Sequence, residues 1–495
     1  MGIVARQSII TSLISYTGIV VGYLNLVYLY PKFLELSQVG LLRTIQDASI
    51  LMVPIASLGL PQIISRYYPR YAAQANRYSA FTGLLLIGAA IGFLIVAAVF
   101  SFSQDFLFSS FREKAPEVME HTGLILLMVL LLSYFGIFEQ IARSQLRIST
   151  PAFLREVGVR LLQAVILGMY VLEWITFNQF LLLSVLLYAG LVIFLIFYLN
   201  ILGAKPELPT KQISSLEFKE IFLFGAISFI GGGSSIIISK VDSLMVSGMV
   251  GLEAAAIYTT TFYMATVIEV PKRAMTTSAT AILSMSFEKN DIKNCEKVYQ
   301  QTALNQMIIG GLLLMGLWAN TDNIFAIMPK GNLYQAGANV ILLIGLTRLI
   351  DMSFGPSSEV IGLSKYYWFN LAVISFLAVS SILLNLILIP QYGITGAAIG
   401  TLISIFTFNI LKFFFILAKL RIQPFNSGTL KTIIVIGLTV VCNLAMPTMK
   451  NVWIDILVRS SVVTLFYGTL ILGWNCSPEV NIQFNKLLKT AGLKR

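Results

Sequence analysis

Long apolar runs, separated by short polar segments, dominate the chain. They fall near residues 8–30, 39–65, 79–103, 119–141, 152–172, 177–201, 218–239, 254–286, 300–319, 337–362, 366–389, 394–418, 430–447 and 451–474. Each is about as long as the roughly 20 residues that a helix needs to cross a bilayer. None alternates polar with apolar residues as a membrane-barrel strand would. The pattern predicts an all-α polytopic membrane protein with about fourteen transmembrane helices.

The composition agrees with this prediction. Hydrophobic residues make up 57% of the 495 residues and charged residues 12%, and the mean hydropathy is +0.83. A soluble domain of this length would carry far more charge. The first apolar run is too long for a signal-peptide core and lacks a small-residue cleavage site, so we expect it to be retained as the first helix.

Metal and nucleotide chemistry find little support in the sequence. The three cysteines, Cys295, Cys442 and Cys476, are scattered and suggest neither a disulfide framework nor a metal cluster. His121 is the single histidine, which argues against histidine-based metal sites and catalysis. No G-x-x-x-x-G-K-[ST] motif occurs, which argues against an ATP-driven pump. We therefore expect no catalytic residues, no metal and no resident cofactor.

Lysine and arginine gather in alternate loops. The basic loops are 66–77, 143–155, 205–219, 289–297 and 419–431, together with the tail 486–495. Positively charged loops stay in the cytoplasm, so this bias places both termini there. The same bias accounts for the net charge of +11 without a nucleic-acid partner.

The two halves of the chain resemble one another. The segment LELSQVGLLRT, followed by Pro54, is similar to VGLEAAAIYTT, followed by Pro271. Parallel six-helix repeats are a recurring transporter design. We therefore expect an N-terminal six-helix lobe at 1–205 and a C-terminal six-helix lobe at 206–421. The linker GAKPELPTKQISSLEFKE would join the lobes, and two appended helices with a cytoplasmic tail would follow at 422–495.

Four stretches resemble one transporter family. Residues 385–404, NLILIPQYGITGAAIGTLIS, are similar to the junction of the eleventh and twelfth helices in the Wzx-type polysaccharide flippases. These belong to the multidrug/oligosaccharidyl-lipid/polysaccharide (MOP) exporter superfamily. Residues 55–71, 241–271 and 360–367 resemble further parts of that family, in the right order. The resemblance covers nearly the whole chain.

The resemblance implies a fold and a function. It implies a V-shaped pair of lobes around a cavity that opens alternately to each side of a bacterial inner membrane. It also implies a substrate, an undecaprenyl-diphosphate-linked oligosaccharide, moved from the cytoplasmic to the periplasmic leaflet to make O-antigen, capsule or exopolysaccharide. Membrane lipids, a polysaccharide polymerase and glycosyltransferases would be its partners. The alternatives are a cation-coupled drug or metabolite antiporter of the same superfamily and a membrane polysaccharide polymerase. The polymerase needs a large outward loop, whereas the outward loop 104–121 is short.

Cations inside the apolar runs are the candidate ligands of a diphosphate. Guanidinium and ammonium groups bind phosphate oxygens strongly, and ionisable residues within a span usually face a cavity. The candidates are Lys272, Arg273, Arg348 and Arg43. In the related lipid II flippases, cavity arginines are implicated in holding the diphosphate. Only Arg43 and Arg273 lie in roughly corresponding places here.

The alternative is that each cation is neutralised on its own helix. Arg43 and Asp47 are spaced i,i+4, and Arg348 and Asp351 are spaced i,i+3. Glu139 with Arg143 and Asp455 with Arg459 repeat the i,i+4 spacing. Glu269 precedes both Lys272 and Arg273, so one cation would remain without a partner there. The anion site is therefore expected to centre on Lys272 and Arg273.

Further residues are candidates for ion coupling and for movement. Carboxylates in a span can exchange H+ or Na+, which makes Asp47, Asp351 and Glu359 the coupling candidates. Prolines and glycines make a helix pliable, whereas the alternative for small residues is close helix packing. The gate or hinge candidates are Lys240, Asp242, Gly231, Gly232, Gly233, Pro54 and Pro271.

Overall fold

The computed structural model describes residues 3–72, 75–107, 109–204, 206–207 and 215–490. Every regular element in these residues is a helix, as predicted. The chain divides into two compact units, Met1–Ala256 and Ile257–Arg495. Part of the predicted linker, 205 and 208–214, and the end of the tail, 491–495, lie outside the described residues.

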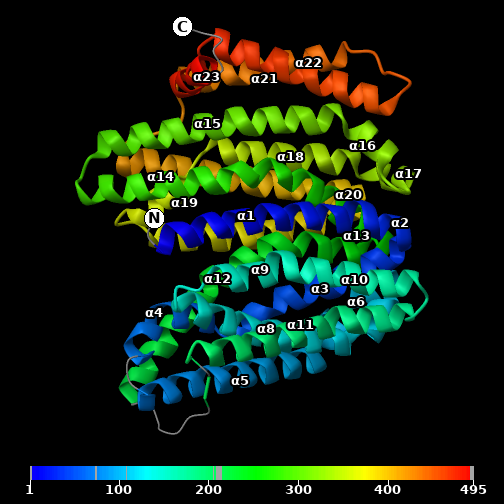
Figure 1. Ribbon diagram of the computed structural model, residues 1–495, viewed down its shortest axis with the longest axis vertical. Helices are drawn as coiled ribbons and strands as arrows, with labels where there is room; N and C mark the ends of the chain where they lie inside the picture. The colour runs from blue at the N-terminus through cyan, green and yellow to red at the C-terminus, as the bar shows by residue number, and fades with distance from the viewer. Residues whose placement is uncertain (1–2, 73–74, 108, 205, 208–214, 491–495) are drawn as a thin grey trace. The chain divides into compact units, whose positions relative to one another are not determined.

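The first unit is built on long helices joined by short ones (Figure 1). They are α1 (Ile3–Tyr23), the π-helical turn η1 (Leu24–Leu29), α2 (Tyr30–Phe33), α3 (Leu36–Ser57), α4 (Leu60–Ala72), α5 (Ala75–Leu107), α6 (Ser109–Lys114), α7 (Pro116–Glu120), α8 (Thr122–Ser144), α9 (Ser149–Phe153), the π-helical turn η2 (Leu154–Gly158), α10 (Val159–Val171), α11 (Phe177–Ile201), α12 (Ser215–Met249) and the start of α13 (Leu252–Ala265). α3 packs along α12, α8 and α5.

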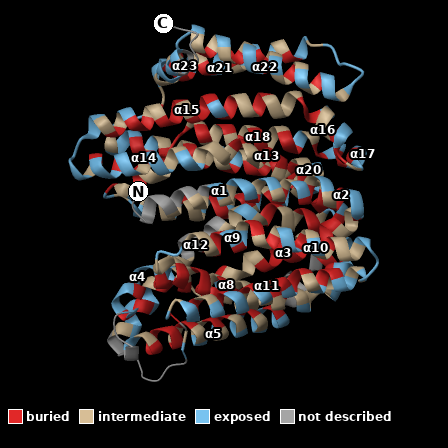
Figure 2. Cartoon of the chain, viewed as in Figure 1, coloured by how far each residue is buried: buried red, intermediate tan, exposed pale blue. Residues whose placement is uncertain are grey.

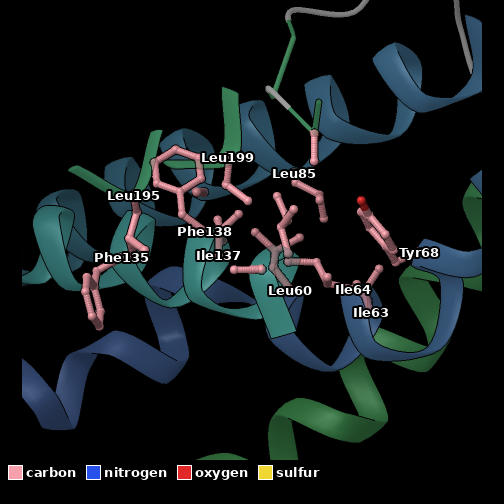
Figure 3. Close-up of a cluster of buried hydrophobic side chains, with 14 of the residues drawn as sticks. Leu60, Ile63, Ile64, Tyr68, Leu85, Phe135, Ile137, Phe138, Leu195 and Leu199 are labelled. Atoms are coloured by element: carbon pink, nitrogen blue, oxygen red, sulfur yellow. The ribbon is translucent and has the colours of Figure 1, made fainter. Parts of the chain in front are cut away.

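The core of the first unit lies where α4, α5, α8 and α11 meet. Figure 3 shows its side chains, among them Leu60, Ile64, Leu85, Phe138 and Leu195, all nearly or fully buried. The outer face of α11 instead exposes large apolar side chains, such as Ile193 and Phe197. Figure 2 shows buried and exposed residues on different faces of the helices. An apolar face of this extent is suited to lipid rather than to water.

The second unit continues from α13. Its elements are the 3-10 turn η3 (Thr266–Glu269), α14 (Val270–Glu288), α15 (Ile292–Ala319), α16 (Thr321–Ile327), α17 (Gly331–Tyr334), η4 (Gln335–Gly337), α18 (Ala338–Ser353), α19 (Ser357–Leu363), α20 (Trp368–Leu420), α21 (Ser427–Leu444), α22 (Val452–Gly473) and α23 (Pro478–Thr490). α15 packs against α14, α18, α21 and α22. The Tyr467 hydroxyl on α22 donates to the Ile308 carbonyl of α15 at 2.9 Å. This bond fixes one of the two last long helices to the bundle.

α20 is two helices joined at a kink. Gly393 has φ 56° and ψ −134°, a conformation that only glycine adopts readily, and Pro390 lies one turn before it. The predicted segments 366–389 and 394–418 therefore form the two arms of α20.

Ten of the described helical segments are long and apolar enough to cross a membrane, the kinked α20 being one of them. The predicted segments 152–172, 218–239 and 254–286 are helical, in α9 to α10, in α12 and in α13 to α14, but are not among the ten. The prediction of an all-α polytopic membrane protein is confirmed, whereas the count of fourteen helices stays a prediction.

The boundary between the units does not coincide with the predicted linker. α12 lies beyond that linker yet packs along α3, and the first unit accordingly extends to Ala256. The three predicted parts, 1–205, 206–421 and 422–495, and the V-shaped arrangement of two lobes stay predictions.

Candidate functional site

The main candidate site lies where the helix path breaks between α13 and α14. The 3-10 turn η3 ends at Glu269, and Pro271 occupies the first turn of α14. Proline fits there because its missing N–H would have no partner in that turn anyway. A short 3-10 stretch between two helices often marks a functional hinge. Pro271, a predicted hinge residue, therefore stands at a real change of helix geometry.

Two ion pairs join this break to α18. The Lys272 ammonium donates to Asp351 Oδ2, and Arg348 Nη1 lies 2.9 Å from Glu269 Oε2. The Arg348 guanidinium also lies 5.3 Å from the centre of the Phe262 ring. Three of the predicted site residues, Lys272, Arg348 and Asp351, therefore come together in one charged network.

The pairing differs from the one that spacing along the chain suggested. Arg348 does not pair with Asp351, and Glu269 pairs with neither Lys272 nor Arg273. The expected pairings within one helix were wrong here because η3 packs against α18, which brings Glu269, and Lys272 just after it, to partners on that helix. Spacing shows which residues share a helix face but not which residues a second helix presents.

Arg273 is exposed at the start of α14. Among the residues that the structure describes, its side chain has no ion-pair or hydrogen-bond partner. The sequence predicted one cation without a partner at this point, and in the structure that cation is Arg273. Its role as a substrate ligand stays a prediction.

The Asp351 carboxylate has a second polar neighbour, from α20. Asn409 Nδ2 donates to Asp351 Oδ1 at 3.0 Å. One turn further along α20 lies Lys412, 2% exposed, whose ammonium donates to Ser358 Oγ at 3.2 Å. The sequence analysis missed Lys412, although a lysine inside an otherwise apolar run is itself a signal. Glu359, a predicted coupling residue, lies half-buried in the first turn of α19, next to Ser358.

A second charged network lies in the first unit, between α3 and α12. The Lys240 ammonium donates to Asp47 Oδ1 at 2.6 Å, and the Ser243 hydroxyl donates to Asp47 Oδ2 at 2.5 Å. Nearer the start of α3, the hydroxyls of Thr44 and Ser247 lie 2.8 Å apart. The two helices are therefore joined by polar contacts over about one turn of α3 and about two turns of α12.

The expected pair of Arg43 with Asp47 does not form. Arg43 Nη1 donates to Gln46 Oε1 at 2.9 Å, and the guanidinium lies 5.6 Å from the centre of the Tyr30 ring. Asp47 is instead occupied by groups of α12, which packs closely on α3. A Cβ atom on Gly40 would lie 1.9 Å from the Leu252 carbonyl oxygen, so only glycine allows this approach. Arg43 belongs to the first unit and the network around Lys272 to the second.

The remaining gate and hinge candidates also lie on α3 and α12. Pro54 is buried near the end of α3, and the chain turns directly after it through Leu58 (φ 48°) and Gly59 (φ 73°). A Cβ on Gly233 would lie 3.7 Å from the Pro54 Cβ, which is close helix packing. Gly231 and Gly232 belong to the same helix, with surroundings that are not described, and Asp242 is buried two residues after Lys240. Their assignment as gate or hinge stays a prediction.

Two of the expected pairs within one helix are confirmed. Arg143 Nη2 lies 2.7 Å from Glu139 Oε1, and Arg459 Nε lies 2.7 Å from Asp455 Oδ2. Arg155 approaches the same Glu139 oxygen at 3.1 Å. These pairs neutralise charge inside their own helices, and we do not assign them to the candidate site.

The ten long apolar helical segments indicate a multi-pass membrane protein. The structure is similar to the lipid II flippase MurJ in an inward closed conformation, with a TM-score of 0.69 and 12% identity over 95% of this chain and 100% of that chain. It is also similar to an inward-facing multidrug resistance MATE family transporter of the MOP superfamily, with a TM-score of 0.63 and 16% identity over 83% of this chain and 94% of that chain. The fold is therefore that of the MOP superfamily.

The sequence comparisons identify the family. Residues 4–282 match the family described as polysaccharide biosynthesis protein, and the chain belongs to this family. A relative is the uncharacterized membrane protein MJ1068 of Methanocaldococcus jannaschii, 23% identical over 471 residues, which are 90% of each chain. The predicted membership of a polysaccharide family with the fold of the MOP superfamily is confirmed.

Proposed function

We propose that the protein is a flippase for undecaprenyl-diphosphate-linked oligosaccharides, which it moves from the cytoplasmic to the periplasmic leaflet of the inner membrane. Its product would supply O-antigen, capsule or exopolysaccharide synthesis. The protein is a transporter without covalent chemistry. Both termini lie in the cytoplasm, as the distribution of lysine and arginine supports.

One observation carries the proposal. A MOP-type fold in a polysaccharide biosynthesis family places an exposed arginine, Arg273, directly beside the ion-paired Lys272 on α14. A diphosphate needs several cationic donors held away from hydrocarbon, and a guanidinium binds phosphate oxygens through two parallel hydrogen bonds. Arg273 is free to do so, and Lys272 and Arg348 lie in the same network.

Transport would proceed by alternating access. The contacts between α3 and α12, Asp47 with Lys240 and Thr44 with Ser247, would close one face of the transporter and separate when it opens. The bends at Pro54 and Pro271 would act as hinges. Movement needs an energy source, and H+ or Na+ exchange at Asp47, Asp351 or Glu359 would supply it.

The test uses cells that lack this gene and any redundant flippase. The expected result is that polyprenyl-linked glycan accumulates in the cytoplasmic leaflet while its synthesis continues. Complementation with Arg273→Glu should fail to restore export at normal protein level. Arg147→Glu is the matched control, because Arg147 is also an exposed arginine but lies in a loop of the first unit. Normal surface polysaccharide in the deletion strain would overturn the proposal.

The second candidate is a cation-coupled antiporter for drugs or metabolites, which the similarity of fold to a MATE transporter favours. The two functions differ in a simple assay. An antiporter would lower the cellular content of a cationic dye in a sodium- or pH-dependent manner, whereas the flippase would leave dye content unchanged.

A further inference from the structure

Lys412 is a buried lysine with no role in the function proposed above. It lies on the second arm of α20 and is 2% exposed. Its ammonium donates to the neutral Ser358 hydroxyl at 3.2 Å and lies 3.9 Å from the centre of the Phe408 ring. Burying an ammonium group is costly unless an anion compensates it. The charges around Lys412 must therefore explain why it is there.

Asp351 is the carboxylate that can compensate the charge of Lys412. Asn409, which is one turn before Lys412 and on the same face of α20, donates to Asp351 Oδ1 at 3.0 Å. The Lys412 ammonium is attracted by the carboxylates of Asp351 and Glu359 and repelled by the ammonium of Lys272. In this structure Lys272 forms the ion pair with Asp351, and Lys412 donates instead to Ser358.

The side chains of Lys272 and Lys412 differ in how far they can move. The Lys272 side chain is 22% exposed and follows the break at Pro271, so it can turn toward a ligand. Lys412 is buried within a continuous helical arm and cannot. If Lys272 left Asp351, a carboxylate that is only 18% exposed would lose its ion pair, which is unfavourable. A second cation already in place removes most of that cost.

We propose that Lys412 is a positioning residue whose buried positive charge compensates Asp351 when Lys272 turns to the diphosphate of the lipid-linked substrate. This inference rests on the proposed function. Lys412 itself does not contact the substrate. It lets Lys272 change partners without leaving an unpaired charge inside the bundle.

The test measures binding of farnesyl diphosphate, a short soluble polyprenyl diphosphate, to the full-length protein in nanodiscs by titration calorimetry. Lys412→Met should weaken binding about tenfold, which corresponds to about 1.4 kcal/mol, because Lys272 then remains on Asp351. Lys412→Arg keeps the charge and should bind within about threefold of the unchanged protein, a difference below 1 kcal/mol.

The decisive variant is the double change Lys412→Met with Asp351→Asn. It removes the carboxylate that would retain Lys272, so binding should return to within about threefold of the unchanged protein, again below 1 kcal/mol. A merely structural role for Lys412 predicts instead that the double variant binds about tenfold more weakly than Asp351→Asn alone, because the packing defect at position 412 persists without the carboxylate. Thermal unfolding of each variant identifies those that have lost the fold, and Lys412→Arg keeps the test open if Lys412→Met does not fold.

The outcomes separate the two proposals. If the unchanged protein does not bind farnesyl diphosphate, the diphosphate site is wrong and the inference falls with it. If the unchanged protein binds and Lys412→Met binds equally well, or the double variant does not recover, only the role of Lys412 is overturned.

Discussion

The contact between Asp47 and Lys240 makes a quantitative prediction about α3 and α12. The carboxylate is 8% exposed and the lysine side chain 31% exposed, so the pair is intermediate between a buried and a surface ion pair. Breaking a fully buried pair costs about 3–5 kcal/mol, and a surface pair contributes about 0–1 kcal/mol. Lys240→Met leaves the carboxylate with the Ser243 hydroxyl alone, and we expect it to lower the free energy of unfolding by about 2–3 kcal/mol.

Substitution of the other member of the pair, Asp47, should lower the free energy of unfolding by less. Asp47→Asn keeps an oxygen that can accept from Ser243, and the released Lys240 ammonium can reach water, so we expect a loss of about 1–2 kcal/mol. In the double variant no carboxylate remains to be left without a cation. The double variant should therefore lose only about 1–2 kcal/mol, which gives a coupling energy of about 1–4 kcal/mol between the two residues.

The assay is a double-mutant cycle on the free energy of unfolding, measured by denaturant titration in detergent micelles. Arg43→Gln provides the control cycle with Asp47→Asn, because Arg43 contacts Gln46 and not Asp47. We expect that control to be additive within about 0.5 kcal/mol. Coupling of Asp47 to Arg43, together with additivity toward Lys240, would show that the pair on one helix exists after all and would refute the reasoning.

Three further predictions concern packing and burial. Gly40→Ala should destabilise the protein by about 1–3 kcal/mol, because its Cβ would meet the Leu252 carbonyl oxygen. Gly123→Ala is the control and should not destabilise the protein, because a Cβ there meets nothing within 4 Å. Both variants are measured by the same unfolding titration. Burial raises the pKa of the Cys476 thiol, which lowers the fraction of reactive thiolate at pH 7. In a variant whose single cysteine is Cys476, maleimide should therefore label the folded protein more slowly at pH 7 than the denatured protein, and labelling should accelerate as the pH rises. Equal labelling rates for the folded and denatured protein would refute this. Arg459→Met should lower the free energy of unfolding by about 3–5 kcal/mol, more than Lys240→Met, since its ion pair is almost fully buried.

The helices themselves were predictable from the sequence. Runs of apolar residues of bilayer length are a local property, and each such run is mostly helical in the described chain, with breaks in 39–65 at 58–59 and in 337–362 at 354–356. The pairs Glu139–Arg143 and Asp455–Arg459 were predictable for the same reason, because the helical period alone places their side chains together.

The partners across helices were not predictable. Lys240 and Asp47 are 193 positions apart, and Lys272 and Asp351 are 79 apart. Their contact depends on how two helices are aligned along each other. That alignment is set by packing details such as the close approach at Gly40, which no pattern in a single sequence reveals. Lys412 was missed because its apolar neighbours made the whole run look like an ordinary span.

The exchanged partners around α18 have a mechanical consequence. Glu269 and Lys272 lie on the two sides of Pro271, and each is joined to α18, by Arg348 and Asp351 respectively. A bend at Pro271 that moves α14 relative to η3 cannot leave both ion pairs unchanged, since each pair is attached on a different side of the bend. Ion pairs formed within one helix would move with that helix and would not oppose a bend at Pro271. We therefore expect these ion pairs to oppose such a bend until an anion bound at Arg273 and Lys272 compensates their charges.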